Sequence, residues 1–98
     1  MSDIVVRDNA AGHRYEAVVN GEVAGFAAYA LAQGLITFVH TEVDDAFEGR
    51  GVGSALAQGA IDDVRAQGTR QVRADCPFIS TWLRRHPEND DLRAPPPR

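Results

Sequence analysis

Short apolar runs alternate with turn residues through the first half of the chain, a pattern typical of β-strands. The strands predicted from these runs are Ile4–Arg7, Tyr15–Val19, Glu22 to about Ala32, and Leu35–His40. Asn20-Gly21 separates the second and third runs and is the strongest short signal for a β-hairpin. Gly25 lies inside the third run, where a glycine indicates a bulge or a close approach of another backbone. We therefore predict an antiparallel meander of about four strands.

The second half of the chain changes to a helical period. Apolar residues recur at every fourth position, which predicts a helix from about Gly51 to Gln67. The recurring residues are Val52, Leu56, Ala60 and Val64. Gly59 weakens such a helix by about 1 kcal/mol relative to alanine, so it indicates close packing against the sheet. Gly68 stands where a glycine commonly ends a helix.

A short strand, Gln71–Asp75, and a second helix, Phe78–Arg85 with Pro77 at its start, complete the predicted elements. Because a strand–helix–strand unit favours parallel pairing, we predict an α+β fold with a mixed, mainly antiparallel sheet, in the order β-meander and then β-α-β-α. Residues 1–90 are expected to form one domain. The proline-rich residues 91–98 are expected to be a disordered tail.

Composition excludes several classes of protein. The chain has 98 residues and a net charge of −4, from ten arginines against fourteen acidic residues, which disfavours a general nucleic-acid binder. No apolar run approaches the roughly 20 residues of a membrane span, and no signal peptide opens the chain. The single cysteine, Cys76, fits a reducing compartment, so we expect a cytoplasmic protein. The exposed edges of a small sheet allow a monomer or a homodimer.

The stretch Phe47–Leu56, FEGRGVGSAL, is the strongest candidate for chemistry. Gly49, Gly51 and Gly53 alternate directly before the predicted helix, with Arg50 between the first two. Glycines let backbone amides approach a ligand, and amides at a helix N-terminus favour phosphate groups. A Rossmann dinucleotide loop needs a different glycine spacing after the first strand of a βαβ unit, so that alternative fails. A glycine-rich connection that binds nothing stays open.

This strand, loop and helix resemble motif A of the GCN5-related N-acetyltransferases, Gln/Arg-x-x-Gly-x-Gly/Ala, which aligns on Glu48–Gly53. The first motif position departs, because Glu48 stands where the family has Gln or Arg. The segments HTEV at His40–Val43, EGRGVGSAL at Glu48–Leu56 and CPFISTWLRRHPEN at Cys76–Asn89 resemble the small YjdJ-like branch of that superfamily. The resemblance covers about residues 15–90 and implies the compact acyl-CoA N-acyltransferase fold.

The resemblance also implies acetyl-CoA as the cofactor and assigns residues to it. The strand end offers backbone groups to the pantetheine arm, and the loop holds the pyrophosphate. The implied cofactor-binding residues are Thr41, Glu42, Val43, Glu48, Gly49, Arg50, Gly51, Val52, Gly53 and Ser54. Arg50 is either a phosphate contact or a solvated surface arginine. The Glu48 side chain is expected to point away from the phosphates.

Two residues are candidates for catalysis. Cys76 precedes a helix start that can activate a thiol, and the resemblance places it near the thioester, where it could carry the acetyl group. The alternative is a small buried hydrophobe. His40 and Glu42 lie on one face of their strand, opposite Thr41, and His40 could take the proton from an attacking amine. The alternative there is an ordinary strand-end histidine.

Four other residues, all in the C-terminal part of the chain, bear on the predicted site. His86 is expected to bond the last carbonyls of the second helix, although it also resembles a family position. Trp82 and Phe78 are expected to be core rather than a lid over the cofactor. Asn89 stands where members of the branch often have a tyrosine, so a tyrosine proton donor does not carry over.

The hypothesis that accounts for all of these features is an acetyl-CoA-dependent N-acetyltransferase that acts on an amine. A CoA-binding module without catalysis is the main alternative, and a scaffold that binds nothing is the third. The acceptor is open among polyamines, small amines, peptide N-termini and protein lysines, and the acidic balance favours a cationic acceptor.

Overall fold

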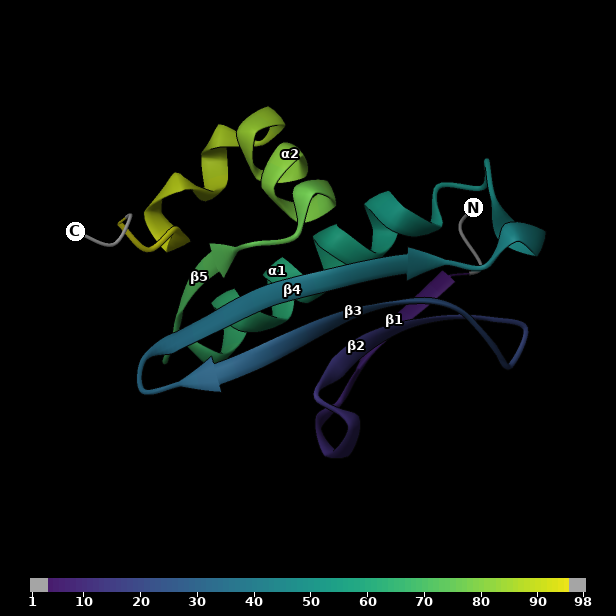
Figure 1. Cartoon of the computed structure of the whole chain (residues 1–98), viewed down its shortest axis with the longest axis horizontal. Coiled ribbons are helices and arrows are strands. Elements are labelled where there is room, and N and C mark those ends of the chain that lie inside the picture. Colours follow the sequence, from purple (N-terminus) through teal and green to yellow (C-terminus); the bar gives the residue numbers. More distant parts are fainter. Residues whose placement is uncertain (1–3, 96–98) are drawn as a thin grey trace.

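The computed structural model describes residues 4–95. Its elements are β1 Ile4–Asn9, β2 Arg14–Val19, β3 Glu22–Ala32, β4 Leu35–Val43, α1 Val52–Gln67, β5 Gln71–Ala74 and α2 Pro77–Arg85. Short 3-10 helices at Ala10–Gly12, Asp45–Phe47 and Pro87–Leu92 join or follow them. Figure 1 shows the strands forming one twisted sheet with α1 crossing it and α2 beside the β4–β5 end.

The sheet has the order β1-β2-β3-β4-β5. The first three pairings are antiparallel and β4 pairs with β5 in parallel, so the predicted mixed α+β fold is confirmed. Asn20 and Gly21 both have positive φ, 50° and 82°, as a tight two-residue hairpin requires. The register shifts between Ala17 and Val18 against β3, and again between Ala28 and Tyr29 against β4. The second shift leaves Val39 as an extra residue on β4.

The core lies between the sheet and α1. Phe38 and Leu56 are fully buried there, and an added Cβ on Gly59 would lie 2.6 Å from the Cβ of Val6. Gly59 therefore permits the close helix–sheet contact that its position predicted. Gly25 likewise sits against β4, since its added Cβ would lie 2.7 Å from the Glu42 carbonyl oxygen.

The opposite face of the sheet has no helix over it among residues 4–95, and we call it the open face. Val5, Val23 and Val39 are 61, 38 and 46 % exposed. Cross-strand register places the side chains of Arg7, Glu16, Phe26 and Glu42 in one row across this face, and those of Arg14, Ala28 and His40 in the next. No helix in the described part of the chain is long and apolar enough to cross a membrane.

The C-terminal segment after α2 lies against the core and the sheet. Leu92 packs against the core, and the Ala94 amide donates to the Val72 carbonyl at 2.8 Å, extending the sheet beyond β5. Arg65 binds both carboxylate oxygens of Asp91, at 2.9 and 3.0 Å. Residues 92–94 therefore contact the core and the sheet, and residues 96–98 of the predicted tail lie outside the described residues.

Candidate functional site

The glycine loop presents free backbone amides at the start of α1. Gly49 and Gly51 have φ of 78° and 76°, which residues with a Cβ rarely adopt, and an added Cβ at either would meet nothing within 4 Å. The first intrahelical bond runs from the Ala55 amide to the Gly51 carbonyl, and no side chain caps the helix. The amides of residues 52–54 therefore have no acceptor among the described residues. With no acidic residue in the first turn of α1, this end favours an anion.

These amides open onto a groove of about 270 Å³ between the loop and α2. Val43 and Phe78 form its other walls, and Glu48 also lines it. Phe78 is 43 % exposed, so its assignment to the core is wrong, whereas Trp82 is buried as expected. An added Cβ on Gly53 would lie 2.7 Å from the Phe78 ring. The third glycine therefore makes room for the aromatic wall of the groove.

Beside the groove, one edge of β4 is free of any described strand. β5 pairs with β4 only from Leu35 to Phe38, and the Phe38 carbonyl then accepts from the amides of both Asp75 and Cys76 as the chain turns into α2. The Asp44 amide donates to the Ala24 carbonyl on β3. Because backbone direction alternates along a strand, Val43 and Thr41 direct their N–H and C=O groups to the free edge, and Glu42 directs its own to β3.

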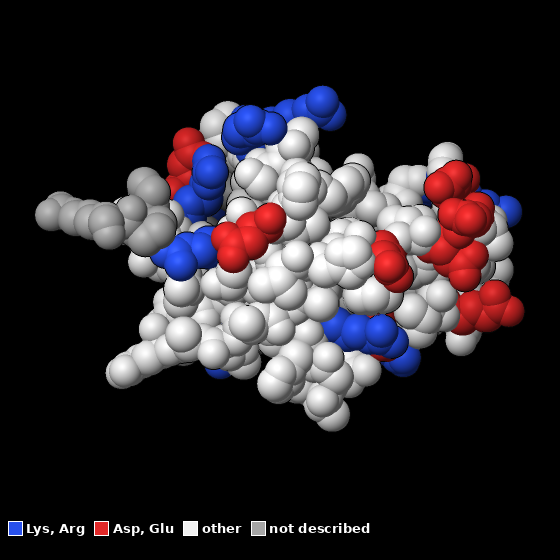
Figure 2. Space-filling model, in the orientation of Figure 1, with Lys and Arg blue, Asp and Glu red and all other residues white. Residues whose placement is uncertain are grey.

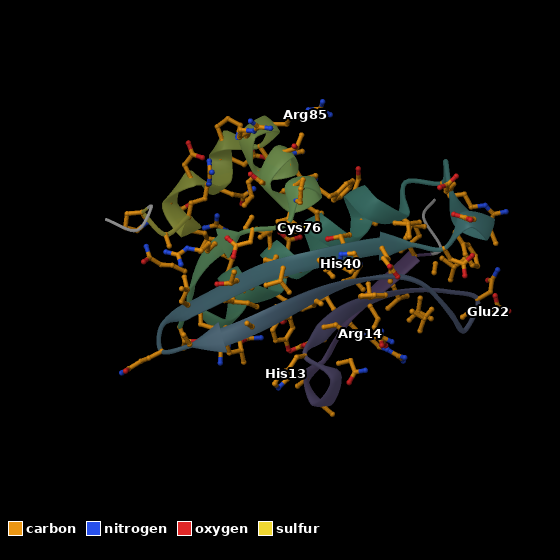
Figure 3. All side chains as sticks on the ribbon, in the orientation of Figure 1. His13, Arg14, Glu22, His40, Cys76 and Arg85 are labelled. Atoms are coloured by element: carbon orange, nitrogen blue, oxygen red, sulfur yellow. The ribbon has the colours of Figure 1, made fainter. Side chains whose placement is uncertain are left out.

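Cys76 lies where β4 and β5 separate, near the start of α2 (Figure 3). Cys76 is 3 % exposed, and its Sγ is 3.1 Å from the Thr41 Oγ1. The thiol therefore faces the helix-covered side of β4, next to the free edge. No ionisable side chain among those described hydrogen-bonds to it.

His40 and Glu42 project from the other side of the same strand. Their side chains pair at 3.1 Å between Nε2 and Oε1 on the open face, as strand alternation predicted. Both are well exposed, at 57 and 62 %. The structure thus brings His40 together with Glu42 but separates both from Cys76 by the thickness of the sheet.

The open face carries a second, larger pocket of about 640 Å³. It is lined by Arg14, Val23, Ala24, Gly25, Phe26, Glu42, Val43, Asp44 and Asp45. Val43 lines the groove and this pocket alike, so the end of β4 separates the two hollows. The pocket therefore reaches the same strand from the side opposite to the glycine loop.

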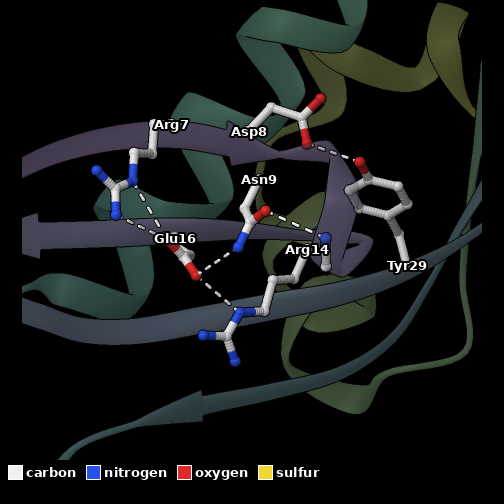
Figure 4. Close-up of polar contacts among 7 residues, drawn as sticks. Arg7, Asp8, Asn9, Arg14, Glu16 and Tyr29 are labelled. Carbon is white, nitrogen blue, oxygen red and sulfur yellow. Dashed lines mark hydrogen bonds and ion pairs between the residues drawn. The ribbon is translucent and has the colours of Figure 1, made fainter.

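Arg14, on β2, and Phe26, on β3, line one end of this pocket. The Arg14 Cζ lies 4.6 Å from the Phe26 ring centroid, and its Nε donates to the Glu16 Oε2 at 2.8 Å. Glu16 is 3 % exposed, yet hydrogen bonds from Asn9, Arg14 and Arg7 hold the pKa of its carboxyl below the usual value against the effect of burial. Figure 4 shows these donors converging on the carboxylate.

Sequence reasoning did not single out Arg14, Glu16 or Phe26, and it assigned Phe78 to the core. The signal for the first three was present, because Arg14 and Glu16 alternate with buried Tyr15 and Ala17 and the Asn20-Gly21 hairpin brings β3 alongside. The bulge after Ala17 shifts that register, so simple counting from the turn misplaces Phe26.

The hydroxyl groups of both tyrosines donate to carboxylates that line neither hollow. The Tyr29 hydroxyl donates to Asp8 at 2.6 Å, and burial together with that carboxylate raises the pKa of Tyr29 to about 12. Burial and the bond to Asp63 raise the pKa of Tyr15 further.

Asn89 and His86 have structural roles. Asn89 is buried and accepts from Arg65 at 3.1 Å. The His86 Nδ1 lies 2.7 Å from the Trp82 carbonyl, which confirms that His86 caps α2. None of these lies in either hollow.

Charge is unevenly distributed around the two hollows. Figure 2 shows carboxylates gathered at the end of the molecule where β4 leads into α1. Asp44 and Asp45 belong to that segment, and the Asp44 Oδ1 accepts from the Ala46 amide at 2.9 Å. Arg50 is the cation of the loop, with its Cζ 5.7 Å from the Phe47 ring centroid.

A mixed sheet whose strands separate beside an uncapped helix start is typical of N-acetyltransferase-like α+β domains. The family model described as GCN5-related N-acetyl-transferase matches residues 14–92, so the chain belongs to this family. The fold is similar to the solution structure of a GCN5-like candidate N-acetyltransferase from Staphylococcus aureus, with a TM-score of 0.70 and 19 % identity. That match covers 100 % of this chain and 95 % of the other. No curated protein matches the chain.

Proposed function

We propose that this protein is an acetyl-CoA-dependent N-acetyltransferase acting on a primary amine. The observation that carries the proposal is the groove in which unpaired helix-start amides, the Phe78 ring and the free edge of β4 converge. Family membership supports acyl transfer in general. From the sequence motifs we also propose that the chain belongs to the small YjdJ-like branch of the family. From its single cysteine we propose a cytoplasmic location.

The residues present fit the chemistry of acetyl-CoA. Amides of Gly49–Ser54 suit the pyrophosphate, and Arg50, which belongs to the same loop, would add a charge-assisted contact. Thr41 and Val43 would pair with the pantetheine arm through their backbones, while Glu42 contributes its side chain on the open face instead. The cofactor supplies an acetyl group activated as a thioester.

The chain contributes positioning and proton transfer to the reaction. The acceptor amine enters from the open face and reacts at the acetyl carbonyl, so that a C–N bond forms and the thioester C–S bond breaks. His40, oriented by Glu42, takes the proton from the ammonium, and CoA leaves as its thiol after protonation from solvent. The Thr41 amide at the free edge is the proposed hydrogen-bond donor to the carbonyl oxygen.

Calorimetric titration with acetyl-CoA and a turnover assay with primary amines test this function together. We expect a dissociation constant in the micromolar range, roughly −8 kcal/mol, and acetylation of at least one amine with release of free CoA thiol. Binding without turnover of any amine would favour the non-catalytic CoA-binding module. A folded protein that binds no acetyl-CoA would contradict both.

Cys76 offers a second route, since its thiol lies at the free edge beside Thr41. In that route the thiol displaces CoA, forming a thioester on Cys76 that the amine then cleaves. Its burial and its separation from His40 favour direct transfer. We therefore expect Cys76→Ala to keep kcat/KM within about twofold.

Mass spectrometry after mixing with acetyl-CoA distinguishes the two routes. Direct transfer predicts no acetyl adduct, of about 42 Da, on Cys76. The chain contains no lysine to confuse the assignment. A hydroxylamine-sensitive adduct that disappears in Cys76→Ala, together with loss of turnover in that variant, would establish the cysteine route instead.

A further inference from the structure

We propose that the pocket on the open face selects acceptors that carry a carboxylate as well as the reacting amine, and that Arg14 binds the carboxylate. The proposal rests on the proposed acetyl transfer, and it specifies the acceptor as an amino-acid-type molecule rather than a polyamine. Arg14 would be a specificity-determining residue, and Glu16 would position it.

The Arg14 guanidinium is held in place before any ligand arrives. Its Nε donates to Glu16 at 2.8 Å, and its Cζ lies over the Phe26 ring, 4.6 Å from the centroid. No residue among 4–95 accepts from its two terminal nitrogens, which point away from Glu16 in Figure 4. The side chain is 35 % exposed and lines the pocket. An immobilised guanidinium with two free nitrogens matches the geometry of a carboxylate.

Glu16 is buried deeply for a carboxylate on an uncovered sheet face. Besides Arg14 it accepts from Arg7 at 3.1 and 3.2 Å and from the Asn9 amide at 3.1 Å. These donors saturate both oxygens, so Glu16 is not free to bind an ammonium. Its negative charge instead fixes Arg14 over Phe26.

The other end of the pocket has the opposite charge. Glu42 stands directly across from Phe26 in the β3–β4 register, and Asp44 and Asp45 follow it along the pocket wall. The His40 ring centroid is 6.0 Å from that of Phe26. Phe26 therefore separates a guanidinium from the His40–Glu42 pair. An acceptor with opposite charges at its two ends complements both, whereas a diamine would place an ammonium against Arg14.

Three acceptors with the same reacting amine and different tails test the proposal. They are 5-aminopentanoate, pentylamine and 1,5-diaminopentane, and a shorter set with three-carbon chains controls for length. We expect kcat/KM to be about tenfold or more higher for the carboxylate tail than for the neutral tail, and lowest for the ammonium tail. The preference should appear mainly in KM. A diamine that reacts as well as or better than the amino acid in both sets would overturn the proposal and leave acetyl transfer intact.

Two variants assign the preference to Arg14. Arg14→Gln should remove the advantage of the carboxylate tail, so that 5-aminopentanoate and pentylamine react with similar kcat/KM, while calorimetry shows the acetyl-CoA affinity of the wild type. Arg7→Gln is the matched control, because Arg7 also binds Glu16 but does not line the pocket. It should keep the preference. An equal loss in both variants would assign the effect to the stability of the Glu16 cluster and contradict the role of Arg14.

A binding measurement keeps the proposal testable without turnover. Titrating 5-aminopentanoate into the protein while following the Arg14 Nε–H resonance by NMR should shift that signal at millimolar concentration, and 1,5-diaminopentane should not. An unmoved resonance with intact acetyl-CoA binding would overturn the carboxylate site alone. Absence of acetyl-CoA binding would instead remove the function on which it rests.

Discussion

Replacing Gly51 with glutamate, Gly51→Glu, is expected to weaken acetyl-CoA binding by at least about 100-fold. Gly51 is the residue before α1, its φ is 76°, and the space beyond its Cα is open. A carboxylate there occupies the anion position and reverses the charge that favours a phosphate. Because each factor of ten is about 1.4 kcal/mol, the expected loss is near 3 kcal/mol. Calorimetric titration with acetyl-CoA measures it.

Two further variants separate this effect from backbone strain. Gly34→Glu introduces the same residue at a φ of 70° with the same open surroundings, in the β3–β4 turn outside the groove. Gly51→Asn tests the loop with a neutral side chain that tolerates positive φ better. We expect Gly34→Glu to leave acetyl-CoA affinity unchanged and Gly51→Asn to lie between the wild type and Gly51→Glu. An equal loss in Gly34→Glu and Gly51→Glu would mean that strain, rather than the site, governs binding.

The elements of the fold follow from local signals that agree with one another. Asn20-Gly21 determines the β2–β3 hairpin because both residues accept positive φ. The stripe from Val52 to Val64 faces the sheet because its period matches a helix. Gly59 was informative for the opposite reason, since only a packing demand accounts for glycine in the middle of α1. These features depend on near neighbours, which a sequence displays directly.

The candidate site depends on contacts that the sequence displays less directly. Phe78 has the helical spacing of a core residue, and its exposure follows from where α2 leaves β5. The bulge after Ala17 decides that Phe26 lies across from Glu16, and thus that Arg14 stacks on it. The composition of residues 91–94 predicts a polar tail, yet the hydrogen bond from the Ala94 amide to the Val72 carbonyl holds this segment on the sheet. In each case, the position of the residue depends on strand register or on the angle at which one element packs against another.

The two faces of β4 divide the proposed work between cofactor and acceptor. Thr41 and Val43 lie on the helix-covered side, where the groove and Cys76 are found, and they turn their backbone groups to the free edge. His40 and Glu42 lie on the open face with the larger pocket. A strand can serve both sides because successive side chains alternate. The acceptor side of the reaction should therefore respond to mutation independently of cofactor binding.

The replacement His40→Gln provides the sharpest measure of that independence. We expect kcat for amine acetylation to fall by about 100-fold, the lower end of the range for loss of a general base. The acetyl-CoA dissociation constant should stay the same, because the His40 side chain lies on the face opposite to the groove. Steady-state kinetics and calorimetry on the same preparation measure the two quantities. His40 is 57 % exposed, so the free energy of unfolding should change by no more than about 0.5 kcal/mol.

Two companion variants complete the experiment. His13→Gln removes an exposed histidine in the turn before β2 that lines neither hollow, and it should retain full activity. Glu42→Gln removes the partner 3.1 Å from His40 and should cause a smaller loss than His40→Gln, because the imidazole stays in place. A larger loss in Glu42→Gln would make Glu42 the base and His40 its partner. Full activity in both variants would mean that the amine arrives already deprotonated, so that positioning along β4, rather than proton transfer, supplies the catalysis.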